Sequence, residues 1–227
     1  MPTREELEVV ALSLKVAFWG VAASLPLAIG TAFVLARKRF PGKTLFDAIV
    51  HLPLVLPPVV VGFALLVLFG RNGPLGRVLE PLGIVFAFRW TGAALAAAIM
   101  GFPLMVRAIR LGIDAVDTRL ESAARTLGAR RWRVFLTVTL PLAWPGLVTG
   151  AMLAFARSLG EFGATITFVS NIPGETQTLP LAIYTFTQVP GADLQALRLS
   201  ILSVLLSLGA LAASETIARR RAPRPDA

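Results

Sequence analysis

Residues able to carry out chemistry are few in this sequence. The 227-residue chain has one histidine and no cysteine, and its acidic residues do not cluster inside its apolar segments. A metal centre needs several His, Cys, Asp or Glu ligands, and covalent catalysis needs a nucleophile beside a base. The sequence therefore offers nothing from which to build a membrane-embedded enzyme.

One short segment copies part of an ATP-binding motif. Gly42, Lys43 and Thr44 match the last three positions of a P-loop, but that motif also needs a glycine five residues before Gly42, where this chain has Arg37. No buried strand precedes the segment either. We therefore expect a loop here and no ATP or Mg²⁺ site on this chain.

A second polar group follows an apolar segment near residue 160. A polar solute that crosses a membrane needs a route with hydrogen-bond donors that replace part of its water shell. The sequence offers a candidate for such a route in neutral donors next to glycine: Gly163, Thr165, Thr167, Ser170 and Asn171. The threonines serve equally well as helix-packing hydroxyls, so both interpretations stay open.

Two further features belong to the same candidate passage. Glu161 lies four residues after Arg157, so the two share a helix face and can neutralise each other, either as a structural ion pair or within a passage. Pro57 and Pro58 must kink or break a helix, and the freed carbonyls need protein or water in place of lipid. The break is then either a packed kink or part of a water-filled path.

Composition places these groups in a membrane protein. Hydrophobic residues make up 56% of the chain, its mean hydropathy is +0.73, and several segments approach the roughly 20 apolar residues that cross a bilayer. We predict an all-α integral membrane protein of one domain, 1–227, with five transmembrane helices at about 9–35, 51–69, 90–111, 142–160 and 199–217. Segment 179–187 is too short to cross and is predicted to be re-entrant or interfacial.

The charge distribution indicates an orientation. The net charge of +9 comes from basic residues in short loops, a pattern of membrane topology and not of nucleic-acid binding. Positive loops face the cytoplasm, which places loops 37–46 and 112–140 and the C-terminus (Arg219–Arg221) inside. The N-terminus and loops 70–89 and 161–195 are then outside.

The longest polar stretch, the predicted coupling region 118–136, lies between two apolar segments. Leu120, Ala124 and Leu127 recur at helical spacing with Ala123 beside them, and Gly128 supplies a left-handed stop. Residues off this apolar stripe are expected to face water: Arg119, Glu121 and Arg125.

This stretch resembles the cytoplasmic EAA motif of permease subunits of ATP-driven (ABC-type) importers. The match rests on Ala123, Ala124, Gly128, Val138, Leu140 and Pro141; Ser122 stands where the motif has its glutamate, and Glu121 precedes it. The resemblance implies a coupling helix that docks on the ATPase through Glu121, Ser122, Ala123, Ala124, Leu127 and Gly128.

Other segments narrow the resemblance. HLPLVLPPVVVG and FVSNIPGETQTLPLAIYT look like the permease of molybdate importers, whereas sulfate/thiosulfate permeases share LPLVLPP and GEFGA in style. The resemblance implies a type I importer permease of the bacterial inner membrane, acting as a homodimer with two ATPase subunits that hold ATP and Mg²⁺, and a periplasmic oxyanion-binding protein. Molybdate and also tungstate are the expected cargo. The alternatives are a sulfate/thiosulfate permease and, without an evident internal repeat to support it, a self-sufficient secondary anion transporter.

Overall fold

Long apolar helices form the body of the protein. The computed structural model describes residues 3–221, without the side chains of residues 211, 213–215 and 217–221, and the described chain contains helices and no strand. The main helices are α1 (Arg4–Arg37), α2 (Lys43–Val55), α3 (Pro58–Phe69), α5 (Trp90–Asp114), α9 (Trp144–Leu159) and α12 (Asp193–Arg221). The shorter ones are α4 (Pro74–Leu79), η1 (Glu80–Leu82), α6 (Thr118–Thr126), α7 (Arg131–Val134), the π-helical η2 (Phe135–Thr139), α8 (Leu140–Leu142), α10 (Gly163–Val169) and α11 (Leu179–Thr187).

Three helices are long and apolar enough to cross a membrane on their own. They are α1, α5 and the described first part of α12, Asp193–Ala210. Each contains most of a predicted span. Two bent helix pairs raise the number of candidate spans to at most five, if each pair counts as one span. The side chains of Arg219–Arg221, used above for orientation, lie outside the described residues.

The second predicted span, 51–69, is not a single helix. α2 begins at Lys43, well before His51, and α3 leaves it at an angle of 109°. Leu56 adopts an extended conformation (φ −69°, ψ 142°), because the ring of a following proline disfavours the helical region. Pro58 then begins α3, where a missing N–H costs nothing. The prolines therefore produce a sharp corner, while Pro53 is accommodated inside α2.

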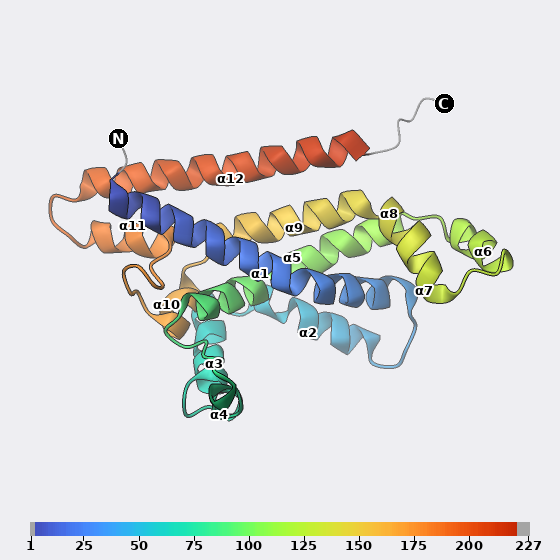
Figure 1. Ribbon diagram of the computed structural model, residues 1–227, viewed down its shortest axis with the longest axis horizontal. Helices are drawn as coiled ribbons and strands as arrows, with labels where there is room; N and C mark the ends of the chain where they lie inside the picture. The colour runs from blue at the N-terminus through green and yellow to red at the C-terminus, as the bar shows by residue number, and fades with distance from the viewer. Residues whose placement is uncertain (1–2, 222–227) are drawn as a thin grey trace.

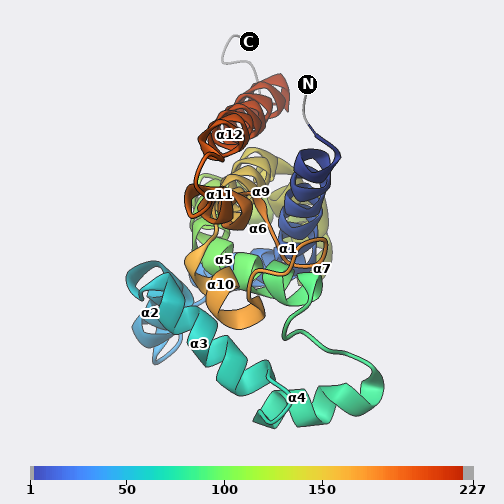
Figure 2. The same ribbon diagram turned by 90° about the vertical axis from the view of Figure 1, so that its left-hand side faces the viewer.

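The helix α5 lies between α1 and α9, and small residues let it approach α9 closely (Figure 2). A Cβ atom added at Gly146 would lie 2.8 Å from the Gly112 Cα, and one added at Gly101 would lie 3.2 Å from the Ala154 Cβ. Small residues at such spacing allow backbone-to-backbone packing where lipid provides no hydrophobic drive. The two helices therefore form the dense centre of the fold.

The nine-residue helix α11 occupies the predicted short segment 179–187. At 1.5 Å per residue it is about 14 Å long, far less than a bilayer core of about 30 Å. Leu179 and Leu181 are buried, and the Leu179 amide donates a hydrogen bond of 2.7 Å to the Ser13 hydroxyl on α1. The helix is thus embedded in protein, as its length requires.

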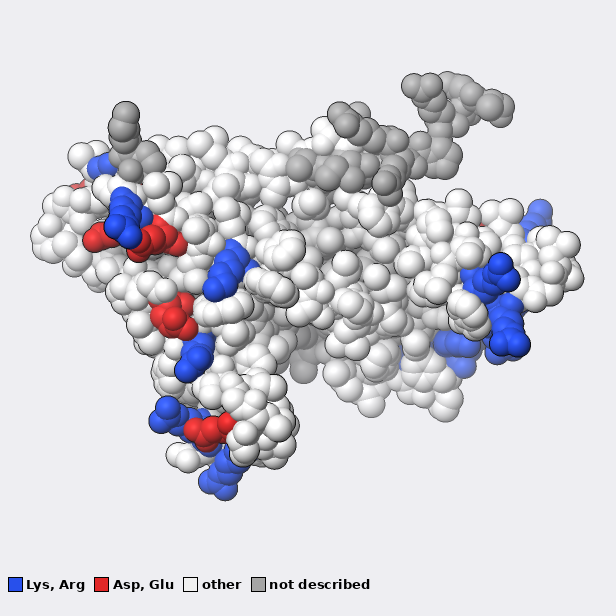
Figure 3. All heavy atoms as spheres, viewed as in Figure 1, with Lys and Arg blue, Asp and Glu red and all other residues white. Residues whose placement is uncertain are grey.

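Charged loops gather at the two ends of the molecule. The turns α1–α2 and α5–α9 and the end of α12 lie at one end, and the start of α1 and the loops around α10 and α11 lie at the other (Figure 1). On the face shown in Figure 3, Lys and Arg dominate the end formed by α6 and α7. Charges of both signs lie at the opposite end, and the surface between the two ends is almost uncharged. This separation matches the division of loops into two sides predicted from their charges.

Candidate coupling and translocation sites

The predicted coupling region forms two short helices and the start of η2. Asp117 caps α6 by accepting a hydrogen bond of 2.8 Å from the Arg119 amide. The helix ends before Gly128, whose φ of +88° is strained for any residue with a Cβ. The predicted turn at Gly128 is confirmed.

The apolar stripe of α6 faces outwards. Leu120 is 50% exposed and Leu127 is 88% exposed, while Ser122 and Ala123 are exposed and Ala124 is half-buried. Exposed apolar residues are ordinary when isolated, and a contiguous patch of them marks an interaction site. Most of the stripe is thus not packed against the described part of this chain.

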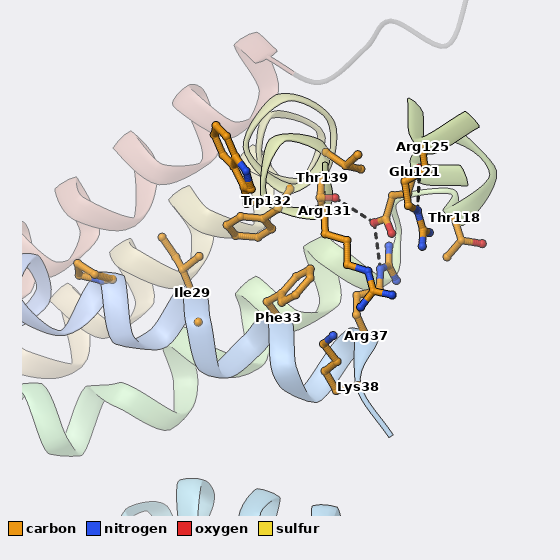
Figure 4. Close-up of a pocket in the computed structure, with 14 residues that line it drawn as sticks. Ile29, Phe33, Arg37, Lys38, Thr118, Glu121, Arg125, Arg131, Trp132 and Thr139 are labelled. Atoms are coloured by element: carbon orange, nitrogen blue, oxygen red, sulfur yellow. Dashed lines mark hydrogen bonds and ion pairs between the residues drawn. The ribbon is translucent and has the colours of Figure 1, made fainter. Parts of the chain in front are cut away.

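Glu121 points the opposite way, and the expectation that it faces water is wrong. Its side chain is only 10% exposed, and its Oε1 lies 3.1 Å from Arg37 Nε (Figure 4). The same oxygen accepts a hydrogen bond of 3.0 Å from the Thr139 hydroxyl, which η2 places there. Glu121 consequently anchors α6 to α1 and η2.

Arg37 connects this carboxylate to the end of α5. Its Nη2 donates two hydrogen bonds of 2.9 Å, to the carbonyls of Ile113 and Val116. The last carbonyls of a helix lack partners within the helix and carry partial negative charge, so a guanidinium is well suited to them. One side chain thus joins the ends of α1, α5 and α6.

Further ion pairs extend the contact between Arg37 and Glu121 towards α2. Asp47 on α2 lies 3.3 Å from Arg110 on α5, and Arg110 lies 3.7 Å from Asp114. Asp114 is 4.0 Å from Arg37, which pairs with Glu121. Exposed ion pairs contribute little to stability when isolated and contribute more as part of a network. We call these five residues the ion-pair chain; it connects the coupling helix to α1, α5 and the bent α2–α3 pair.

The two proposed translocation segments lie side by side at α3 and α10. A Cβ added at Gly62 would lie 2.5 Å from the Ala164 carbonyl oxygen, and one added at Gly163 would lie 2.8 Å from the Pro58 Cβ. The proline corner and the glycine-rich segment therefore share one seam. Figure 1 shows α10 at the opposite end of the molecule from α6.

Arg157 and Glu161 form the ion pair that their spacing predicts. Arg157 Nη1 lies 2.6 Å from Glu161 Oε2, and Glu161 is 2% exposed. Its other oxygen accepts a hydrogen bond of 2.8 Å from the Ala164 amide at the start of α10. This geometry supports the structural reading of the pair.

The predicted donors differ in accessibility. Thr165 is buried within the chain, and the Thr167 hydroxyl donates to the Gly163 carbonyl at 2.8 Å. Asn171 donates to the Thr185 hydroxyl on α11 at 2.7 Å. Ser170 is exposed, as is Pro57. Within a single chain, Thr165 therefore lies behind the surface of the seam, and Thr167 is half-buried in it.

The P-loop-like segment lies in the turn between α1 and α2. Gly42 precedes α2 in a turn between two helices, and Lys43 Nζ donates to the Lys38 carbonyl at 3.2 Å. Over the described residues, no three His, Cys, Asp or Glu side chains gather as a metal site would require.

Comparison with known proteins decides the family. Residues 24–222 match the family described as "Binding-protein-dependent transport system inner membrane component". The chain belongs to this family. It is therefore a multi-pass inner-membrane permease, and its helical fold is that of ABC importer permeases.

Individual relatives agree with this assignment. The permease is 61% identical to "Molybdenum transport system permease protein ModB" of Escherichia coli K12, over 96% of this chain and 95% of that protein. It is 56% identical to the ModB of Haemophilus influenzae, over 95% and 94%. The "Sulfate transport system permease protein CysW" of Synechococcus elongatus is 40% identical, over 78% of this chain and 62% of that protein.

A solved structure supports the fold. The permease superposes with a TM-score of 0.75 on a chain of a bacterial ABC transporter involved in the import of the acidic polysaccharide alginate. The match covers 98% of this chain and 82% of that chain at 16% identity. At this identity the similarity concerns the fold alone.

Sequence reasoning missed Arg37 as a functional residue of the permease. Its position after an apolar segment, next to Lys38 and Arg39, is typical of the charged end of a membrane helix. Only folding brings Arg37 to Glu121, 84 residues away in sequence.

Proposed function

We propose that this permease imports molybdate as a homodimer, with two ATPase subunits that hold ATP and Mg²⁺ and a periplasmic binding protein that delivers the oxyanion. The observation that carries the proposal is the 61% identity to a molybdenum permease over nearly the whole chain. Identity to the sulfate permease is lower and covers less of both proteins. Tungstate, which nearly equals molybdate in size and charge, is expected to follow the same route.

We assign ATPase docking to the exposed face of α6. Leu120, Ala123 and Leu127 are exposed apolar residues of α6 that do not pack into the described part of the chain, and Gly128 ends this face. Ser122, which replaces the motif's glutamate, is also exposed on α6. Glu121 contributes from the inner side, where it ties the docking helix to Arg37.

We assign the α6–α7 end to the cytoplasm and the α10–α11 end to the outside. The support is the excess of basic residues in the loops 37–46 and 112–140. The N-terminus is then external, as the first helix and the loops near Gly174 lie at that end (Figure 1).

We assign the outer part of the passage to the seam between α3 and α10. Pro57 and Ser170 are exposed there, and Thr167 lies between the two helices. Exposed apolar residues on α3, including Val59, Val60 and Phe63, offer a surface for the second copy. A passage between two copies suits a route lined with neutral groups, because it must release the dianion readily.

Uptake measurements test the cargo. The permease is produced with its ATPase and binding protein in cells lacking other molybdate permeases, and intracellular molybdenum is measured by mass spectrometry. We expect uptake that excess tungstate suppresses and excess sulfate does not. Suppression of molybdate uptake by sulfate, at the concentration used for tungstate, would identify a sulfate importer instead.

Association with the ATPase tests the coupling assignment. Leu127→Asp places a charge on the docking stripe and should abolish uptake and co-purification of the ATPase while the permease stays in the membrane. Ser122→Glu, which restores the usual residue of the motif on the exposed surface of α6 away from the leucines, is the matched acidic control and should retain both. Equal loss in the two variants would show that any acid on α6 disrupts folding, and full activity of Leu127→Asp would place docking elsewhere.

A further inference from the structure

A large open cavity lies between the end of α1 and the coupling region (Figure 4). Its volume is about 760 Å³, within the range of sites for drug-sized or larger ligands. The walls come from α1, α6, α7 and η2, so the cavity adjoins the contact between Arg37 and Glu121. Of the docking and passage residues proposed above, only Glu121 lines it.

One end of the cavity is basic. Four cations line it, Arg37, Lys38, Arg125 and Arg131, against the single carboxylate of Glu121. Arg37 already pairs with that carboxylate, and Arg125 Nε donates only to the Glu121 main-chain carbonyl, at 3.2 Å. Among the described residues, Lys38 and Arg131 form no ion pair. Three positive charges are thus left without a counter-charge.

The other end of the cavity is apolar and follows one face of α1. Pro26, Ile29 and Phe33 recur at helical spacing along this face, and the ring of Phe33 packs edge-on against Phe135 at 4.7 Å between centroids. Trp132 also lines the cavity and is 62% exposed. These α1 residues lie within the predicted span 9–35, and Arg37 and Lys38 lie just beyond its end. The apolar wall is therefore at membrane depth and the basic end at headgroup depth.

We propose that this cavity binds an anionic phospholipid, with its phosphate between Lys38 and Arg131 and an acyl chain along α1 from Phe33 towards Pro26. Basic pockets between membrane helices are known to select anionic headgroups, and guanidinium groups match phosphate oxygens with paired hydrogen bonds. A small soluble anion would satisfy the cations and leave the apolar wall uncovered. A zwitterionic lipid would cover the wall and leave the excess charge uncompensated.

The position of the site gives the lipid a role. The bound headgroup would lie beside Arg37 and Glu121, which anchor the coupling helix. An anionic lipid would thus hold α6 and α7 against α1 by a contact that the protein alone does not supply. The inference goes beyond molybdate transport. The depth of the site rests on the predicted span 9–35, and its place in the cytoplasmic leaflet rests on the orientation proposed above.

The test compares two double variants of equal charge in the assembled importer. Lys38→Gln with Arg131→Gln removes two cations that line the cavity; Arg39→Gln with Arg133→Gln removes two exposed neighbours that do not. Phosphatidylglycerol retained by the purified complex is measured by native mass spectrometry in discs of phosphatidylcholine and phosphatidylglycerol. Each basic residue near an anionic headgroup contributes about fivefold to affinity, so we expect about a 25-fold loss in the first variant and under a threefold loss in the second.

Three results would overturn the proposal. Equal losses in both variants would indicate general surface charge, and unchanged retention in the cavity variant would place the lipid elsewhere. Displacement of the lipid by inorganic phosphate or molybdate would identify a site for soluble anions. For a cavity variant that fails to assemble, quenching by brominated phosphatidylglycerol in the native importer decides instead: a loss of quenching in Trp132→Phe supports the site, and unchanged quenching contradicts it.

Discussion

The contact between Arg37 and Glu121 predicts a large and unequal response to substitution. Arg37→Ala leaves Glu121 buried with one hydroxyl partner and removes two donors from the end of α5. Breaking a buried pair from one side costs about 3–5 kcal/mol, and we expect the lower end because Thr139 still bonds the carboxylate. Glu121→Ala leaves Arg37 with both carbonyls, so its cost should be about 1.5–2 kcal/mol.

The double variant isolates the interaction itself. We expect Arg37→Ala with Glu121→Ala to cost about as much as Arg37→Ala alone, which corresponds to a coupling energy of about 2 kcal/mol or about 30-fold in the unfolding equilibrium. The free energy of unfolding is measured by titrating SDS into the purified permease in mixed micelles and following tryptophan fluorescence.

The exposed pair Arg4–Glu8 is the matched control. Its atoms are 3.2 Å apart, nearly the same distance, but its side chains are 93% and 58% exposed. Such pairs contribute about 0.3–0.5 kcal/mol. A coupling energy for Arg37 and Glu121 no larger than that of the control pair would refute the reasoning that burial makes this contact strong.

Three further outcomes follow from the structure. Gly146→Val pushes a side chain into the α5 backbone and should lower the free energy of unfolding by about 1–3 kcal/mol in the same SDS titration. Gly209→Ala should be neutral, because the space around an added Cβ there is open. Equal effects of the two variants would contradict the close contact. A reporter inserted at Gly174 should be external and one fused to the C-terminus cytoplasmic, and the same side for both would refute the orientation. Thr167→Asp should block uptake in an assembled complex while ATP hydrolysis continues, because an added negative charge repels the dianion, and Thr167→Ser should transport normally; uptake by the Asp variant would place the passage away from α10.

Local and periodic features of the fold were predictable from the sequence. Hydropathy located the helices that became α1, α5 and α12, and Gly128 marked its turn, because both depend on residues close in sequence. Proline indicated a break before α3 but not its angle of 109°, which depends on what α3 packs against. The start of α2 at Lys43 was not predicted, because the residues from Lys43 to His51 are more polar than a membrane span requires.

The candidate coupling site was predictable only on its outer side. The exposed stripe on α6 follows from helical spacing, whereas the inward direction of Glu121 depends on Arg37 arriving from another helix. Helical periodicity assigned the carboxylate to water because Glu121 lies off the apolar stripe. Thr165 illustrates the same limit: its hydroxyl suggested a passage, and tertiary packing buried it.

The glycine contacts between α5 and α9 have a mechanical consequence. Added Cβ atoms would lie within 3.0 Å of the facing helix at Gly112, Gly146 and Gly150, and one at Gly101 would lie 3.2 Å from the Ala154 Cβ. Two helices in close contact at several levels cannot rotate or slide against each other without opening a void at each level. The two helices are therefore expected to move as one rigid unit. A change between open and closed states must then take place elsewhere, at the corner between α2 and α3 or at a contact between two copies. Spin labels on α5 and α9 should keep one distance throughout the transport cycle, while labels on α3 should change theirs.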